Sequence, residues 1–368
     1  MTDGLFRRAI ADLVPYEPGK PAEEVQRELG LARVVKLASN EGPFPPFPAA
    51  LEAIERAARD LNRYPDGGVW ALRAALADRH GVAFDEVVVG AGADAVIDLL
   101  SQATLDPGDE IVCGWPSFPS YVLDAAKLGA TAVKVPLRDH VYDLDALLGA
   151  VTPRTKLVYV CHPNNPTGTA NGRRELESFL DAVPGHVLVV LDQAYFEYID
   201  DPDYADGIAE HFVPGRRVVV LRTFSKIYGL AGLRVGYAVA PADVVAATSK
   251  VRRAFDVTST AQAAALASLD DGGELARRRN ANAAGRARLE DVLRSHELEV
   301  AQPSLGNFVY AEVGDGRAVF EQLLRHGVIV RPLAGFGAPS AIRVSVGAPD
   351  ENEAFADALG HVLSSVST

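Results

Sequence analysis

The stretch Arg222-Thr-Phe-Ser-Lys-Ile-Tyr-Gly-Leu-Ala-Gly-Leu-Arg234 lies between two apolar runs, and the rest of the chain is organised around it. Residues 218–221 predict a buried strand, and residues 234–240 predict the next one. Lys226 therefore lies on an irregular link of small and hydroxyl residues, whereas a solvated lysine more often lies on the polar face of a helix. Loss of water around Lys226 would favour its neutral, nucleophilic amine.

Hydroxyl groups and a guanidinium flank this lysine. Thr223 and Ser225 can donate hydrogen bonds to a phosphate group, and the planar fork of Arg234 can hold two of its oxygens. A lysine beside a phosphate site suggests a Schiff base to pyridoxal phosphate. A loop lysine with no chemical role fits this stretch alone equally well.

The composition predicts a large globular protein. The chain has 368 residues, 48% of them hydrophobic, which is enough for a large core and two domains. Its formal net charge of −13 argues against nucleic acid and acidic membrane surfaces as partners. We expect no signal peptide and no membrane span, because no apolar run is long enough. Cys113 and Cys161 have no metal-binding spacing, so we expect no metal site, free buried thiols and a cytoplasmic location.

Strand and helix patterns alternate through the middle of the chain. Short apolar strands are predicted at residues 87–89, 110–113, 132–135, 156–161 and 187–191, with helical patterns between them. This alternation predicts an α/β fold with a mostly parallel central sheet and helices on both faces. We divide the chain into an N-terminal arm at 1–35, a large cofactor-binding domain at 36–265 and a small C-terminal α+β domain at 266–368, which the N-terminal segment joins.

The segment Gly90-Ala-Gly-Ala-Asp94 follows a predicted strand and opens a predicted helix, so Gly92, Ala93 and Asp94 can present backbone N–H groups to a phosphate. The same segment matches a dinucleotide-binding pattern, which leaves an NAD-dependent oxidoreductase as a distant alternative. The acids at 109 and 110 precede the second strand, whereas a ribose-binding acid belongs at its far end. The nicotinamide interpretation is therefore disfavoured.

Further polar and aromatic residues follow the other predicted strands, where ligands bind in open α/β sheets. Phe118 can stack on a planar cofactor, and Asn165 can donate to a phenolate oxygen. Asp192 ends an apolar strand and needs a positive partner, for which the pyridinium nitrogen of pyridoxal is suitable. Tyr195 is then within reach of the phenolic oxygen.

These motifs together resemble the fold-type I pyridoxal-phosphate aminotransferases of class I and II, and most closely their histidinol-phosphate branch. The resemblance is carried, nearly end to end, by Leu37-Ala-Ser-Asn-Glu41, Arg63-Tyr-Pro-Asp66, Pro163-Asn-Asn-Pro-Thr-Gly168, Asp192-Gln-Ala-Tyr195, Thr223-Phe-Ser-Lys226 and Ile342-Arg-Val-Ser-Val-Gly347. It implies that the matching Lys226 binds the cofactor covalently and moves the substrate proton. Asp192 would pair with the ring nitrogen, Asn165 and Tyr195 would hold the phenolic oxygen, and Phe118 would stack on the ring.

The resemblance also implies a homodimer with shared sites, in which Tyr64 reaches the cofactor phosphate of the neighbouring subunit. Arg343 corresponds to the arginine that binds the substrate anion, and Arg331 to a second arginine near it. Tyr16 corresponds to an N-terminal tyrosine over the site, and Asn40 to a substrate-binding position. The implied small molecules are an amino donor and the 2-oxoglutarate/glutamate pair.

Some positions depart from the family pattern. Ala93 stands where the phosphate loop usually has serine, Phe118 stands where the histidinol-phosphate enzymes usually have tyrosine, and Gln193 replaces a glutamate. These departures bear on the substrate. Arg331 and Arg343 suit a dianion, so histidinol phosphate is the expected donor, in histidine biosynthesis; an aromatic amino acid such as phenylalanine is the alternative.

Overall fold

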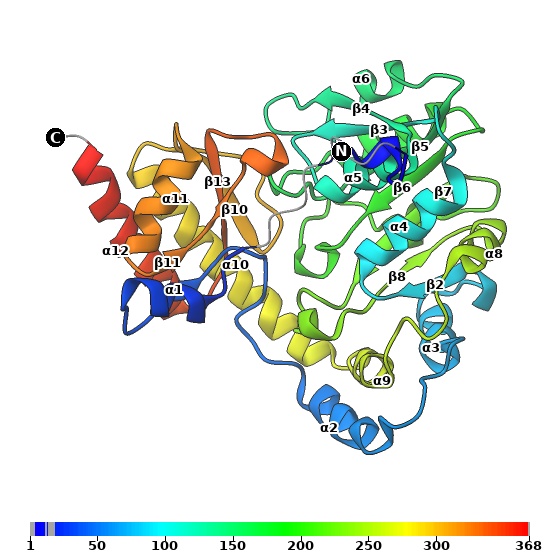
Figure 1. Cartoon of the computed structure of the whole chain (residues 1–368), viewed down its shortest axis with the longest axis horizontal. Coiled ribbons are helices and arrows are strands. Elements are labelled where there is room, and N and C mark those ends of the chain that lie inside the picture. The colour runs from blue at the N-terminus through cyan, green and yellow to red at the C-terminus, as the bar shows by residue number, and fades with distance from the viewer. Residues whose placement is uncertain (1–3, 12, 14–18, 367–368) are drawn as a thin grey trace.

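The computed structural model describes residues 4–11, 13 and 19–366, and its largest element is a central sheet (Figure 1). The sheet contains β2 (Val87–Gly90), β3 (Glu110–Trp115), β4 (Thr131–Pro136), β5 (Thr155–Cys161), β6 (Leu188–Asp192), β7 (Val218–Thr223) and β8 (Gly236–Val239), in the order β2-β8-β7-β6-β5-β3-β4. Neighbouring strands are parallel except β8, which is antiparallel to both β2 and β7. The predicted mostly parallel sheet is confirmed.

Every residue of β2, β6, β7 and β8 is buried, which shows that both faces of this sheet are covered. The covering helices are α4 (Ala93–Thr104), α5 (Pro119–Leu128), α6 (Leu144–Gly149), α7 (Arg173–Ala182) and α8 (Ala242–Val251). α4 contacts α5 and α8, whereas α6 contacts α7. β4 departs from the predicted burial: it is one of the two edge strands, and only Val135 in it is buried.

Three helices form a separate group below the sheet in Figure 1: α2 (Pro48–Ala57), α3 (Trp70–His80) and α9 (Ser259–Ala267). α9 contacts both α2 and α3. The sequence patterns did not predict α9. Its sequence, STAQAAALA, is rich in alanine, so large apolar side chains do not mark one face of the helix.

The C-terminal part has its own antiparallel sheet, in the order β12 (Arg331–Pro332), β13 (Ala341–Ser345), β10 (Phe308–Glu312) and β9 (Glu299–Val300). Its helices are α10 (Gly272–Ser295), α11 (Gly316–Arg325) and α12 (Pro349–Val366). β11 (Val328–Ile329) does not join this sheet. It pairs in parallel with β1 (Val35–Lys36), which follows α1 (Ala22–Leu29) near the N-terminus.

Two large hydrophobic cores follow from this arrangement. The first contains buried residues between 47 and 275, together with Phe308, and the second contains residues between 25 and 38 and between 289 and 362. α10 runs between the two (Figure 1). Leu37 and Ala38 pack in the second core, so the chain enters the first core only at Phe47. The division at residues 36 and 266 stays a prediction. No helix of the described ranges is long and apolar enough to cross a bilayer.

Candidate active site

Lys226 lies on the link between β7 and β8, as the sequence predicted. Its local turn is closed by a hydrogen bond from Gly229 N to Lys226 O at 3.0 Å, and Gly229 adopts a φ of +71° that a side chain would oppose. The amine Nζ lies 3.5 Å from Ser39 O. Burial and, next in size, the positive charge of Arg343 lower the pKa of the Lys226 amine to about 8. The lysine is therefore poised to lose its proton near neutral pH.

Asp192 is the last residue of β6 and is buried. Tyr121 Oη donates to its Oδ2 at 2.6 Å, and Ala194 N donates to its Oδ1 at 3.1 Å, so the carboxylate is held in one orientation. Burial raises the pKa of Asp192, because the low-dielectric surroundings disfavour its charge. A cationic ligand group beside Asp192 would stabilise the negative charge of its carboxylate.

A cavity of about 170 Å³ brings these groups together. The last residues of three neighbouring strands, Cys161 of β5, Asp192 of β6 and Thr223 of β7, lie in its wall, as expected for a parallel sheet. The residues predicted from the sequence that line it are Asn40, Ala93, Asp94, Phe118, Asn165, Asp192, Tyr195, Thr223, Ser225, Lys226, Arg234 and Arg343.

Other lining residues were not predicted: Ser39, Ile97, Cys161, Ala194 and Phe336. Ile97 follows Ala93 by one helical turn on α4, so helical spacing alone could have found it. Phe336 lies in a short turn after β12, and no sequence signal connects it to the site.

A cradle for an anion lies at the first turn of α4, where the backbone N–H groups of the helix N-terminus lie near the guanidinium of Arg234. Gly92 caps the helix with a φ of +93°, and a Cβ built on it would lie 2.6 Å from Arg234 Nη2. Only glycine leaves this space open. Arg234 Nη1 also donates to Ser225 Oγ at 3.5 Å. Helix dipole, hydroxyl and guanidinium all favour an anion here, so the described residues fit the phosphate of pyridoxal phosphate.

Arg343 lies on β13, is buried and lines the same cavity. Its Nη1 donates to Asn165 Oδ1, and its Nη2 donates to Ala38 O at 2.8 Å. Arg331 is the Cα partner of Arg343 across the antiparallel pair of β12 and β13. It does not line the cavity, and its guanidinium lies 5.5 Å from the ring of Phe336. The predicted arginine pair is therefore adjacent, with Arg331 outside the cavity wall.

One predicted tyrosine, Tyr64, does not line the cavity of its own chain. The Tyr64 side chain is 81% exposed and stacks on Phe255, with ring centroids 4.7 Å apart. Tyr16 lies outside the described residues. Tyr195 does lie in the cavity wall, where Asn40 Nδ2 donates to its hydroxyl at 2.9 Å.

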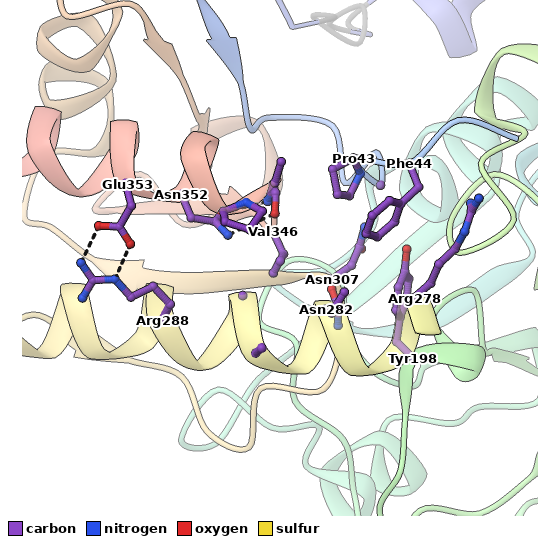
Figure 2. A pocket seen from close by; sticks show the side chains of 17 residues that line it. Pro43, Phe44, Tyr198, Arg278, Asn282, Arg288, Asn307, Val346, Asn352 and Glu353 are labelled. Atoms are coloured by element: carbon purple, nitrogen blue, oxygen red, sulfur yellow. Dashed lines mark hydrogen bonds and ion pairs between the residues drawn. The ribbon is translucent and has the colours of Figure 1, made fainter. Parts of the chain in front are cut away.

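A second, larger cavity of about 260 Å³ lies between α10 and the first turns of α12 (Figure 2). Phe44, Tyr198 and Asn282 line it, and an ion pair between Arg288 and Glu353 joins the two helices at its edge. None of the residues predicted for catalysis or cofactor binding lines this cavity. The smaller cavity is therefore the candidate active site.

Comparisons with known proteins identify the family to which the chain belongs. Residues 32–359 match the family described as "Aminotransferase class I and II". The chain is 44% identical to the histidinol-phosphate aminotransferase of Moorella thermoacetica, over 97% of this chain and 92% of that protein. It is 47% identical to that of Anaeromyxobacter sp., over 96% and 98%. The crystal structure of histidinol-phosphate aminotransferase from Sinorhizobium meliloti, in complex with pyridoxal-5'-phosphate, superposes with a TM-score of 0.90 at 31% identity, covering 99% of this chain and 98% of that one. The chain belongs to the class I and II aminotransferases and has their fold-type I architecture.

Proposed function

We propose that the protein is a pyridoxal-phosphate-dependent histidinol-phosphate:2-oxoglutarate aminotransferase of histidine biosynthesis. The observation that supports the chemistry best is a single cavity that holds Lys226, with its lowered pKa, beside the buried carboxylate of Asp192 and the buried guanidinium of Arg343. The substrate assignment is supported by relatives of that name at 44–47% identity over nearly the whole chain.

The cofactor would be held at both ends. The cradle formed by Gly92, Ala93, Asp94, Thr223, Ser225 and Arg234 would bind its phosphate. Asp192 would keep the ring nitrogen protonated, Phe118 would stack on the ring, and Asn165 and Tyr195 would bind its phenolic oxygen. When bound, pyridoxal phosphate supplies an electron sink that makes the α-proton of an amino substrate acidic.

Lys226 would hold the cofactor through Nζ and would accept the substrate α-proton at that same atom. A pKa of about 8 suits this exchange, because both protonation states are then accessible near neutral pH. Arg343, which is fixed through its bonds to Asn165 and Ala38, would bind the substrate anion and hold the reacting carbon near Lys226.

We propose that Arg331, the cross-strand neighbour of Arg343, also binds the substrate phosphate from outside the cavity wall. Arg331→Ala is then expected to reduce catalytic efficiency on histidinol phosphate by about ten- to a hundred-fold, because a charge-assisted hydrogen bond contributes about 1.5–3 kcal/mol. Phenylalanine, which needs chiefly Arg343, should lose less. The measurement is kcat/KM of wild type and variant on both donors, with the exposed Arg294→Ala as the matched control. A wild type that prefers phenylalanine, or an equal loss on both donors, would assign the protein to the aromatic amino acid aminotransferases instead.

We also propose that the enzyme is a homodimer with shared sites. Large apolar side chains are exposed around the predicted shared residue: Leu61 is 60%, Tyr64 is 81%, Trp70 is 65% and Phe255 is 45% exposed. Exposed apolar groups in one region mark an interface more often than free surface. A partner that covers this region could receive Tyr64 in its own phosphate cradle.

Mixing inactive Tyr64→Ala and Lys226→Ala dimers is expected to restore activity as subunits exchange. In a heterodimer with shared sites, one site carries both defects and the other is intact, so a statistical mixture should reach about one quarter of wild-type activity. As the control, mixing Lys226→Ala with Asp192→Ala should restore nothing, because both residues line the cavity of one chain. If the mixture of Tyr64→Ala and Lys226→Ala recovers no activity, Tyr64 does not serve the partner's site.

The proposed location is the cytoplasm. Cys113 and Cys161 are both buried and free, and burial raises the pKa of the Cys113 thiol to about 12. Buried, protonated thiols of this kind suit a reducing compartment.

A further inference from the structure

Asn40 is the centre of a buried hydrogen-bond network at the edge of the active-site cavity. Its backbone N donates to Ser345 Oγ at 2.8 Å, and its backbone O accepts from Asn307 Nδ2 at 3.0 Å. Its side-chain Oδ1 accepts from Ser345 Oγ at 3.2 Å, and its Nδ2 donates to Tyr195 Oη at 2.9 Å. Asn40 has a φ of +54°, a left-handed conformation that asparagine tolerates better than most residues.

The hydrogen atoms of this network can be assigned by counting. Ser345 Oγ accepts the backbone N–H of Asn40, so its one hydrogen is free for Asn40 Oδ1. With Oδ1 occupied by the serine, Asn40 must present Nδ2 to Tyr195. Tyr195 Oη is then an acceptor towards Asn40, and its own hydrogen is free to point into the cavity.

The opposite orientation of the amide would reverse this direction. The two ends of an asparagine amide exchange places on rotation, so the neighbouring groups decide which end faces where. With Oδ1 turned to Tyr195, the tyrosine would donate its hydrogen to Asn40 and have none for the cavity. Nδ2 would then face a serine oxygen that already accepts one hydrogen bond, and the serine hydrogen would have no acceptor in Asn40.

The position of Ser345 is itself fixed. It is the last residue of β13, its Cα is paired with that of Phe308 in β10, and its N donates to Leu37 O at 2.9 Å. Asn307, the other anchor of Asn40, precedes β10 and lines the second cavity (Figure 2). The C-terminal sheet thus holds Asn40, whereas Tyr195 packs in the core of the central sheet.

We propose that Ser345 is a positioning residue: its hydroxyl fixes the Asn40 amide, which directs the hydroxyl hydrogen of Tyr195 towards the phenolic oxygen of the cofactor. The inference rests on the proposed function, because that oxygen belongs to pyridoxal phosphate. Ser345 does not line the cavity, so it acts through Asn40 and Tyr195. Without its hydroxyl, the two amide orientations become similar in energy, and a fraction of Tyr195 turns its hydrogen away.

Cofactor-loaded enzyme without substrate gives a readout that is independent of turnover. A hydrogen bond donated to the phenolic oxygen draws negative charge from it and lowers the pKa of the linked Lys226 nitrogen. Tyr195→Phe should therefore raise the pH midpoint of the visible absorbance change by about 1–2 units, and Ser345→Ala should raise it by about 0.5–1 unit. Ser268→Ala, which removes another buried serine hydroxyl, should leave the midpoint unchanged.

Two comparisons separate this role from simple packing. Ser345→Thr keeps the hydroxyl and Ser345→Val has the same shape without it, so the valine variant alone should raise the midpoint. In the double variant Ser345→Ala/Tyr195→Phe the midpoint should equal that of Tyr195→Phe, because Ser345 acts through the tyrosine. Equal midpoints for threonine and valine, an unshifted Ser345→Ala, or additive shifts would overturn the inference. A wild type with no visible cofactor band would contradict the proposed function instead.

Discussion

Replacement of Lys226 by alanine is expected to reduce kcat on histidinol phosphate by at least about 10⁴-fold, because one side chain supplies both the nucleophile and the proton carrier. The variant should still bind pyridoxal phosphate, since the phosphate cradle and Asp192 are untouched. Burial lowers the pKa of Lys226 to about 8, so its removal takes no favourable buried charge from the fold at neutral pH. The apoprotein is therefore expected to keep its Tm.

Chemical trapping completes this test. Borohydride reduction of the loaded wild type should place the cofactor mass on the peptide that contains Lys226, and none should be trapped in Lys226→Ala. Lys156→Ala, which removes a lysine outside the cavity, is the control and should behave as wild type. A cofactor trapped on another lysine, or turnover by Lys226→Ala within tenfold of wild type, would remove Lys226 from the mechanism.

Asp192→Ala is expected to weaken cofactor binding by about 10²–10⁴-fold, because loss of one member of a buried ion pair costs about 3–5 kcal/mol. The pyridinium nitrogen would remain in a buried site that now lacks its negative partner. The rate should fall as well, since an unprotonated ring is a poorer electron sink. Cofactor affinity measured by titration of the apoprotein, together with kcat, checks both effects.

Asp192→Asn separates charge from shape. The asparagine oxygen can still accept from Ala194 N, and its NH2 group can donate to the Tyr121 hydroxyl, so it should retain more cofactor affinity than activity. Asp124→Asn is a matched control, because Asp124 is also a buried carboxylate and pairs with Lys127 outside the cavity. A near-normal rate in Asp192→Asn would show that the carboxylate charge does not control the cofactor ring.

Much of the fold was predictable because the patterns that mark its strands and helices lie within short stretches of sequence. Strands β6 and β7 each begin with four consecutive apolar residues, and that pattern is typical of strands covered on both faces. Two features were not predictable in this way. The antiparallel direction of β8 and the pairing of β1 with β11 are contacts between distant segments, and the two-residue strands β1 and β11 are too short to show a period.

The cavity wall was largely predictable for a related reason. Polar residues that directly follow apolar strands must gather at one edge of a parallel sheet, and Asp192 and Thr223 do so. The residues that position the cavity side chains through hydrogen bonds were not predictable. Tyr121 points at Asp192 from α5, and Ser345 reaches Tyr195 only through Asn40, which is 305 residues away from it in sequence. The predicted roles of the individual residues await the experiments above.

Single-turnover spectroscopy of the wild type tests the central claim most directly. Enzyme loaded with pyridoxal phosphate is mixed with histidinol phosphate, phenylalanine or glutamate, each without a keto acid, and the visible band of the lysine-bound cofactor is followed. The account predicts rapid bleaching by histidinol phosphate, recovery on addition of 2-oxoglutarate, and bleaching by phenylalanine that is slower by at least about tenfold. A band that histidinol phosphate leaves unchanged, or that phenylalanine bleaches faster, would contradict it.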